Sequence, residues 1–315
     1  MILPKTFKGY SLATVSYLTQ AIGAICSKAL IDASSMEATA TFWYASGTVI
    51  SFLLLLCTQG GLKWQSIRRN LSIYLQISLI MTVASVGWFV GLRLAGPGLV
   101  AFMQQLATVM GVLMGAFILG ERITFLDGIG VSLAITGALL ITYRSEQAVI
   151  WGILAALFNA AGLAMQNFLV KRHVQRIDDF ELLFVRSLTA AIAIPLFFWF
   201  TSGIAMPAAW LLPAFFVSSF VGYVLFNLLV YASLAYADLA KVSVLRVITP
   251  PASMIGAYLV FNTVPTQAQL GGGVLILIGV SFILAQPLLG PRTPQETPRS
   301  VCNEPVTDEC PGCRG

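Results

Sequence analysis

The sequence has little charge and almost no histidine. Charged residues make up 10% of the 315 positions, and the one histidine is His173. Soluble domains normally carry roughly a quarter charged residues. A chain of this length has no soluble core large enough to hide a 57% hydrophobic composition. The composition therefore excludes an ordinary soluble protein and makes the bilayer the solvent for most of the chain.

The chain also lacks the motifs of catalysis and of nucleotide-driven pumping. No Gly-x-x-x-x-Gly-Lys-Ser/Thr loop is present, and no Ser/His/Asp set, metal-ligand cluster or buried carboxylate pair stands out. A channel would need a repeated selectivity motif or a ring of like charges, which is also missing. We therefore expect a protein that is not an enzyme, with no cofactor and no metal site.

The five cysteines fall into two groups. Cys26 and Cys57 lie in apolar runs and are expected to be packing residues, whereas Cys302, Cys310 and Cys313 lie in the last residues of the chain. A single C-x-x-C without a second pair is weak evidence for a metal or redox site. Residues 291–315 are rich in Pro, Gly and Glu, so we expect a disordered cytoplasmic tail.

What the sequence does contain is a series of apolar runs. A helix needs about 20 mostly apolar residues to cross the hydrocarbon. Ten such runs are found, at 9–31, 38–57, 73–92, 98–119, 125–143, 149–170, 180–200, 211–232, 239–261 and 270–288. Their length and the absence of apolar–polar alternation favour helices over a β-barrel. The sequence predicts an all-α integral membrane protein with ten transmembrane helices.

The basic residues are unevenly placed around these runs. If the N-terminus is cytoplasmic, the inner side receives the tail arginines together with Lys5, Lys8, Lys63, Arg68, Arg69, Arg122, Lys171, Arg172 and Arg176. The outer side receives little beyond Lys28, Arg93 and Arg144. This is the positive-inside pattern, which places both termini in the cytoplasm. The net charge of +5 is thus a topology signal, and no nucleic-acid partner is needed to explain it.

The two halves of the chain resemble each other. Residues 115–117 (Gly-Ala-Phe) align with 256–258 (Gly-Ala-Tyr), Thr108 aligns with Thr249, and Gly130 with Gly271. Five helices in each half, at 1–146 and 147–290, would insert the second half upside down, as in many secondary transporters. The alternative is that apolar helices resemble each other through composition alone.

One motif makes the resemblance to a known family specific. Gly120, Glu121, Arg122 and Thr124 follow an apolar helix and precede one that contains Gly128, Gly130 and Gly137, and the second copy has Asn262, Pro265, Gln269, Gly271 and Gly279. This pattern, with Ser27-Lys28 and Arg186, resembles the EamA-type permeases of the drug/metabolite transporter superfamily. The resemblance covers residues 9–288 and implies ten helices around a central cavity.

Polar side chains inside a membrane are costly, so those within the predicted helices are candidates for function. The predicted substrate-binding residues, several of which share helical faces, are Arg246, Gln105, Tyr223, Asn227, Gln20, Asn159, Trp88 and Arg186. For each amide the alternative is hydrogen bonding between helices, and for the aromatic residues it is packing or interfacial anchoring. For Arg186 the alternative is that its long side chain extends its charge to the membrane–water interface. We expect these faces to converge on one water-filled cavity.

Arg246 is the most informative of these residues. It lies about 10 Å into its predicted helix, where an unpaired guanidinium costs at least about 2.5–3.5 kcal/mol. It must therefore face water, a structural partner such as Asp238, or a substrate. Pro250 and Pro251 each remove a backbone hydrogen bond, which frees the carbonyl groups of Arg246 and Val247. The prolines predict a hinge beside the cation, or a kink that serves packing alone.

These observations predict a function. The membrane-embedded charge is positive and no Asp or Glu is predicted in mid-helix, so a small anionic or zwitterionic metabolite such as an amino acid or organic acid is the expected substrate. The protein is expected to be a secondary transporter, with export as the expected direction, that works by alternating access in a bacterial or archaeal cell (inner) membrane. A sugar-phosphate, nucleotide-sugar or multidrug carrier of the same fold and a scaffold or receptor are the alternatives. A coupling proton or ion and a homodimer stay open.

Overall fold

The computed structural model describes residues 5–59, 61, 64–119, 124–143, 146–173, 177–234, 236 and 245–289. All regular structure in these residues is helical. The first half contains α1 (Lys5–Ala33), α2 (Met36–Gln59), α3 (Trp64–Arg69), α4 (Leu71–Leu94), α5 (Gly96–Leu119) and α6 (Phe125–Tyr143). The predicted tail and its three cysteines lie outside the described residues.

The second half is less regular than the first. It contains α7 (Gln147–His173), α8 (Asp179–Thr201), the 3-10 turn η1 (Ala209–Leu211), α9 (Leu212–Ser219), the π-helix η2 (Phe220–Leu225), α10 (Phe226–Leu234), the 3-10 turn η3 (Arg246–Ile248), α12 (Thr249–Phe261) and α13 (Gln267–Leu289). The predicted run at 211–232 is thus one rod with a π-helix in its middle. In the run at 239–261, the described part begins with Leu245 and η3.

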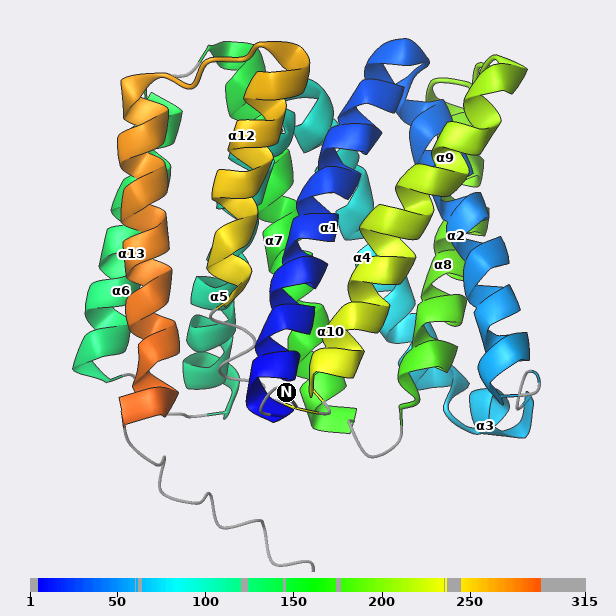
Figure 1. Ribbon diagram of the computed structural model, residues 1–315, viewed down its shortest axis with the longest axis horizontal. Coiled ribbons are helices and arrows are strands. Elements are labelled where there is room, and N and C mark those ends of the chain that lie inside the picture. The colour runs from blue at the N-terminus through cyan, green and yellow to red at the C-terminus, as the bar shows by residue number, and fades with distance from the viewer. Residues whose placement is uncertain are drawn as a thin grey trace, which may run out of the picture.

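Eight described helices are long and apolar enough to cross a membrane. They are α2, α4, α5, α6, α7, α8, α13 and the rod Ala209–Val230, which runs from η1 through α9 and η2 into α10. Large apolar side chains such as Phe117, Leu139 and Trp199 are exposed on their outer faces, where lipid would cover them. Of the two remaining predicted spans, α1 is less apolar and α12 has 13 residues, but both pack within the same bundle (Figure 1).

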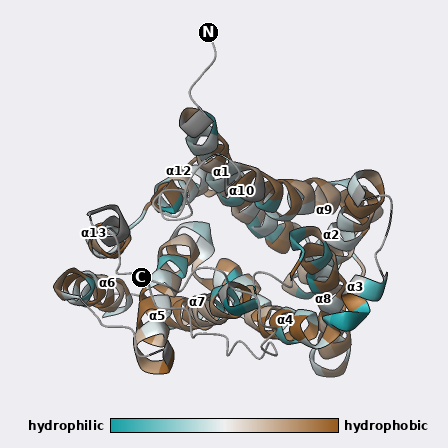
Figure 2. Ribbon diagram, turned by 90° about the horizontal axis from the view of Figure 1, so that it is seen from below, coloured by the Kyte–Doolittle hydropathy of each residue, from teal (hydrophilic) through white to brown (hydrophobic). Residues whose placement is uncertain are grey.

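The helices form two facing rows. Seen along the bundle, α13, α12, α1, α10, α9 and α2 make one row and α6, α5, α7, α4 and α8 make the other (Figure 2). The start of α1 and the end of α13 lie at the same end of the bundle (Figure 1). Each row therefore contains helices from both halves of the sequence.

The neighbours of each helix follow a matched pattern in the two halves. The contact of α4 with α7 has its counterpart in the contact of α10 with α1. In the same way, the contact of α5 with α7 has its counterpart in the contact of α12 with α1. Three further contacts, α2 with α8, α5 with α12 and α6 with α13, join corresponding predicted spans of the two halves. The arrangement is the one expected if each half is a copy of the other.

Matching hydrogen bonds begin the fifth predicted span of each half. The Thr124 amide donates to Asp127 Oδ2 (3.1 Å) and the Asp127 amide to Thr124 Oγ1 (3.3 Å). The Thr266 amide donates to Gln269 Oε1 (3.0 Å) and the Gln269 amide to Thr266 Oγ1 (3.3 Å). Both are capping boxes, which satisfy backbone donors at a helix start. The two copies of this helix are therefore offset by 142 residues in the sequence, which is the difference between positions 124 and 266.

This register corrects the alignment of Gly130 with Gly271. A shift of 142 residues pairs Gly130 with Gly272 and Gly137 with Gly279. The contacts agree: α6 and α13 cross with Gly130 against Gly279 and Gly137 against Gly272. The sequence alignment used the offset of 141 residues that relates Thr108 to Thr249 in the preceding helix. The second copy has one more residue in the loop, so the offset of the next helix is 142. In that loop Asn262 ends α12 in the left-handed conformation (φ 52°), which Asn tolerates well.

The glycine crossing generates a prediction about stability. A Cβ atom at Gly130 would lie 2.5 Å from the Gly279 carbonyl oxygen, whereas one at Gly128 would meet no atom within 4 Å. We expect Gly130→Ala to force α6 away from α13 and to lower the free energy of unfolding by about 1–3 kcal/mol. Gly128→Ala, two residues away on the same helix, should be neutral or slightly stabilising. Thermal unfolding of the detergent-purified variants checks this, and equal unfolding temperatures would contradict the close crossing.

Candidate functional site

Four of the predicted site residues lie in two groups with neighbours that were not predicted, and the two groups are built from different helices. The Arg246 group consists of Arg246, Gln105, Tyr17, Thr249 and Ser253, from η3, α5, α1 and α12. The Arg186 group consists of Arg186, Gln166, Tyr223, Tyr44 and Trp43, from α8, α7, η2 and α2.

A break in the helix positions Arg246. Pro250 has no N–H to donate to the Arg246 carbonyl, and the chain forms the 3-10 turn η3 here instead of continuing as an α-helix. The Thr249 amide donates to that carbonyl within the turn. The Gln105 Nε2 amide, from α5, donates to the same oxygen at 3.1 Å. The carbonyl that the sequence predicted to be freed by proline is thus bonded by a side chain from the other half.

The Arg246 guanidinium makes no hydrogen bond or ion pair with any residue in the described ranges. The Tyr17 hydroxyl on α1 lies within electrostatic range of it. The Tyr17 ring packs against Leu245 and Phe226, with 6.1 Å between the Tyr17 and Phe226 ring centroids. Asp238, the alternative partner, lies outside the described residues. Arg246 is therefore a partly buried cation held beside α1, with a neutral polar neighbour.

Several polar atoms on the helices that contribute the Arg246 group are buried without a hydrogen-bond partner among the described residues. They are Gln105 Oε1 on α5, Thr249 Oγ1 and Ser253 Oγ on α12, and Gln20 Oε1 on α1. Gln105 is 2% exposed and Ser253 is fully buried. Buried polar atoms normally have partners, and each one left alone is energetically costly. The two amide oxygens can accept and the two hydroxyls can also donate, so α1, α5 and α12 carry hydrogen-bonding groups that a polar solute could use.

Arg186 lies on a second polar centre. Its Nη1 donates to Gln166 Oε1 at 3.1 Å, and its guanidinium carbon lies 5.0 Å from the centre of the Tyr223 ring. The Tyr223 hydroxyl donates to the Leu183 carbonyl at 3.0 Å. The Tyr44 position aligns with Arg186 in the other half, and the two residues interact electrostatically. Arg186 is therefore part of a network between helices.

Aromatic rings surround this centre. The Trp43 ring centroid lies 5.3 Å from that of Tyr223 and 5.6 Å from that of Trp88. The Tyr44 hydroxyl is 2.5 Å from Ser85 Oγ. Trp88 also packs against Phe89, with 4.8 Å between the ring centroids. Trp88 therefore belongs to an aromatic cluster that joins the two halves of the chain through Tyr223.

The π-helix η2 shapes the Arg186 group. A π-helix has a wider turn than an α-helix, so its carbonyls are not all bonded in the α pattern. Asn227 Nδ2 donates to the Tyr223 carbonyl at 2.6 Å. Gly222 of η2 lies against Gly23 of α1, where a Cβ atom at Gly23 would come within 2.2 Å of the Gly222 backbone. Sequence reasoning missed the π-helix, because its residues fit an ordinary apolar helix.

Two predicted site amides bond the backbone or another amide. Asn159 Nδ2 donates to the Ala84 carbonyl at 3.0 Å, and Asn159 Oδ1 accepts from Gln104 Nε2 at 2.9 Å. Asn159 therefore joins α7 to α4 and α5, and Asn227 bonds the Tyr223 carbonyl one turn earlier in its own rod. The bonds of Asn159 are of the kind that the alternative describes, between helices, whereas the bond of Asn227 lies within one rod. Gln20, on α1, contributes an unpartnered oxygen and stays a candidate for binding.

One buried acid was not singled out by the sequence analysis. Glu181, in the first turn of α8, is 1% exposed and its Oε2 accepts a hydrogen bond from the Tyr74 hydroxyl at 2.8 Å. The same hydroxyl accepts from the Asp178 amide at 3.0 Å. An acid in a first helical turn is ordinary, so only the position of Tyr74 on α4 reveals that this one is buried.

Comparison with known proteins identifies the family. No curated protein matches the chain. A solved structure titled as the crystal structure of a protein has a TM-score of 0.60 to this chain at 18% sequence identity, over 90% of this chain and 98% of that one, which supports the fold. The model of the EamA-like transporter family matches twice, over residues 7–143 and 150–285. With both halves matched, the chain belongs to the EamA-like transporter family and is a multi-pass membrane protein of the drug/metabolite transporter type.

Proposed function

We propose that this protein is a secondary transporter that exports a small anionic or zwitterionic metabolite, such as an amino acid or organic acid, by alternating access. Family membership supports transport. The single observation that carries the substrate class is the Arg246 guanidinium. It has no acidic partner in the described part of the chain, and it lies in a 3-10 turn that leads into α12, where the buried hydroxyls of Thr249 and Ser253 can donate to an anion.

The placement of the acids supports this substrate class. The buried acids in the described ranges are Asp127 and Glu181, which lie in the first turns of α6 and α8. Asp127 is bonded by Thr124 and Glu181 by Tyr74. Neither lies beside Arg246. An exporter of cationic drugs would need a carboxylate in the site, so the same-fold multidrug alternative is disfavoured. A phosphate-bearing solute stays a second candidate, because a guanidinium binds phosphate as well as carboxylate.

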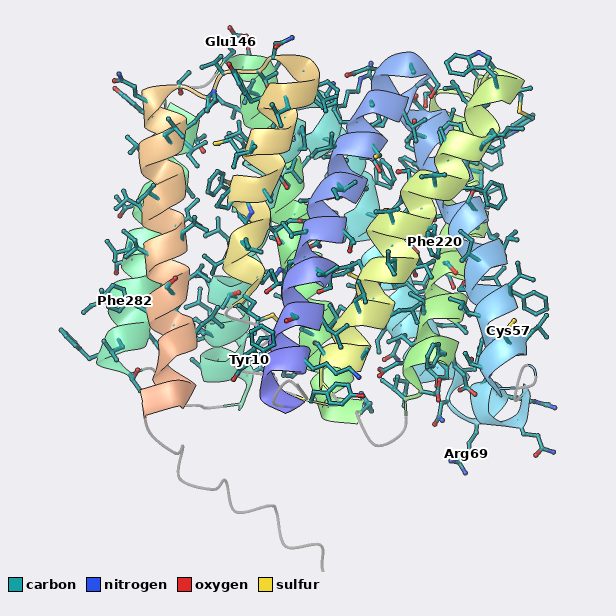
Figure 3. All side chains as sticks on the ribbon, viewed as in Figure 1. Tyr10, Cys57, Arg69, Glu146, Phe220 and Phe282 are labelled. Atoms are coloured by element: carbon teal, nitrogen blue, oxygen red, sulfur yellow. The ribbon has the colours of Figure 1, made fainter. Side chains whose placement is uncertain are left out.

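Alternating access requires two inverted halves of five spans, which is the architecture that we propose. The two family matches, the paired capping boxes and the matched helix contacts support it. α1 and α7, which begin the halves, start at opposite ends of the bundle, with Glu146 at the end away from the start of α1 (Figures 1 and 3). On this proposal α1 and the η3–α12 segment complete the ten spans, and the halves rock about the bundle centre.

The orientation that we propose places both termini in the cytoplasm of a bacterial or archaeal cell. The short helix α3 carries Arg68 and Arg69 and lies at the same end as the start of α1 (Figure 3). Basic residues are enriched on the cytoplasmic side of membrane proteins, which supports this orientation. A scaffold or receptor without transport would give no use to the unpartnered polar groups around Arg246.

The substrate proposal predicts the effect of removing Arg246. A thermal-shift screen of the purified protein against a metabolite library first identifies a stabilising solute, since ligands of the folded state raise its unfolding temperature. In proteoliposomes we expect Arg246→Ala to raise KM for that solute about tenfold or more, because a hydrogen bond to a charged group contributes about 1.5–3 kcal/mol. Arg93→Ala is the matched control, since Arg93 lies at the end of α4, 3.9 Å from Glu37. An unchanged KM in Arg246→Ala would contradict the assignment.

The orientation proposal predicts the labelling of two positions. In a variant without native cysteines, we expect Arg69→Cys to react with a membrane-impermeant thiol reagent only from the cytoplasmic side. Glu146→Cys should react only from the outside, because an odd number of proposed spans separates the two positions. Labelling of intact cells and of inverted vesicles measures this. Reaction of both positions from the same side would rule out five spans per half.

A further inference from the structure

The Gln105 amide bonds the turn that forms where Pro250 prevents a regular α-helix. In an α-helix the residue at position 250 would donate its N–H to the carbonyl of residue 246. Proline cannot, and the chain forms the 3-10 turn η3, in which the Thr249 amide donates to that carbonyl instead. The Gln105 amide is a second donor to the same oxygen, at 3.1 Å, and ties the turn to α5. In the described residues this is the one hydrogen bond between α5 and the η3–α12 segment.

The environment of Gln105 indicates that this bond is a built feature. Gln105 is 2% exposed, so its amide does not donate to bulk water. Its Oε1 has no partner, and the bond to Arg246 is therefore the reason the structure offers for a buried amide here. The neighbouring Gln104 instead bonds Asn159 on α7. The two amides of α5 thus serve different helices.

The bond also joins the two halves at corresponding positions. Thr108 aligns with Thr249, which places Gln105 opposite Arg246 in the alignment of the halves. α5 packs against α12 across the space between the rows. A change in the packing of one half against the other would therefore act directly on the backbone that carries Arg246.

We propose that Gln105 is a positioning residue: its amide anchors to α5 the η3 turn that Pro250 imposes and so fixes the direction of the Arg246 guanidinium. The inference rests on the proposed function only in taking the Arg246 guanidinium as the group that binds the solute. The positioning itself is independent of any substrate. Gln105 need not contact the solute to control how it is bound.

A double-mutant cycle tests the proposal on the full-length purified protein. The variants are Gln105→Leu, Pro250→Ala and the two combined. The readouts are the unfolding temperature and the rate at which phenylglyoxal modifies Arg246, followed by mass spectrometry. We expect Gln105→Leu to lower the unfolding temperature by about 2–4 °C and to raise the modification rate about fivefold, because the turn opens more often. In the Pro250→Ala background the alanine N–H can donate to the Arg246 carbonyl, so Gln105→Leu should have no further effect on either readout.

Three controls separate positioning from general loss of stability. Gln104→Leu should destabilise the protein equally with and without Pro250→Ala, because its partner is Asn159. Arg186, modified in the same sample, should react at an unchanged rate in Gln105→Leu. Gln105→Asn keeps the amide but shortens its reach, so it should behave as Gln105→Leu does and serves if the leucine variant does not fold.

Two results would overturn the proposal. One is an effect of Gln105→Leu that is equal in the wild-type and Pro250→Ala backgrounds. The other is an unchanged Arg246 modification rate in Gln105→Leu and Gln105→Asn. Neither readout uses a substrate, so the two proposals fail separately. An Arg246→Ala variant that transports normally would refute the proposed function but not the positioning role of Gln105. An additive double-mutant cycle would refute the positioning role but not the proposed function.

Discussion

Hydrocarbon offers no hydrogen bonds to a polypeptide, and the rest of this structure depends on how the chain meets that constraint. A regular helix satisfies its own backbone. Apart from the 3-10 turn η1 at the start of its rod, the described spans depart from regular α-helix at η2 and at η3, and in each of these two places an amide side chain bonds a backbone carbonyl. Asn227 bonds the Tyr223 carbonyl in η2, and Gln105 bonds the Arg246 carbonyl in η3. The two irregular turns carry the residues most suited to binding.

The close-packed and the irregular parts of the bundle lie in different places. α6 and α13 meet through glycine, with backbone against backbone, at the edge of the bundle (Figure 2). Such contacts have no side chains to rearrange, so they favour a rigid pair. α1, α5 and α12 instead enclose unpartnered oxygens and a cation. The rigid pair joins the two halves at one edge of the bundle, and the polar, irregular segments lie away from it.

The sequence predicted much of the fold, because hydrophobic length is a strong signal in membranes. The run at 125–143 has the bounds of α6, and a 3-10 turn at Arg246–Ile248 precedes the proline pair. The glycine register failed by one residue, because loop length is not encoded in helical periodicity. The π-helix was not predicted, since the residues of η2 would also fit an α-helix.

The site was harder to predict than the fold. Arg246 and Gln105 do lie together, but through the Arg246 backbone, which no side-chain pattern reveals. Asn159 and Asn227 are the residue type expected in a binding site, and only their partners show that Asn159 joins α7 to α4 and that Asn227 bonds a carbonyl of its own rod. Trp43 was missed because one more aromatic in an apolar helix carries no signal, although its ring contacts those of Tyr223 and Trp88.

The central claim is that a broken helix holds a cation in the water-accessible centre of a membrane bundle. The most direct test is the reactivity of Arg246→Cys toward a water-soluble, membrane-impermeant thiol reagent, in a chain without its native cysteines. The account predicts that this position reacts from each side of the membrane, while Ile276→Cys, fully buried where α6 and α13 cross, does not react from either. If Arg246→Cys were as unreactive as Ile276→Cys from both sides, the centre would be dry and the account would be wrong.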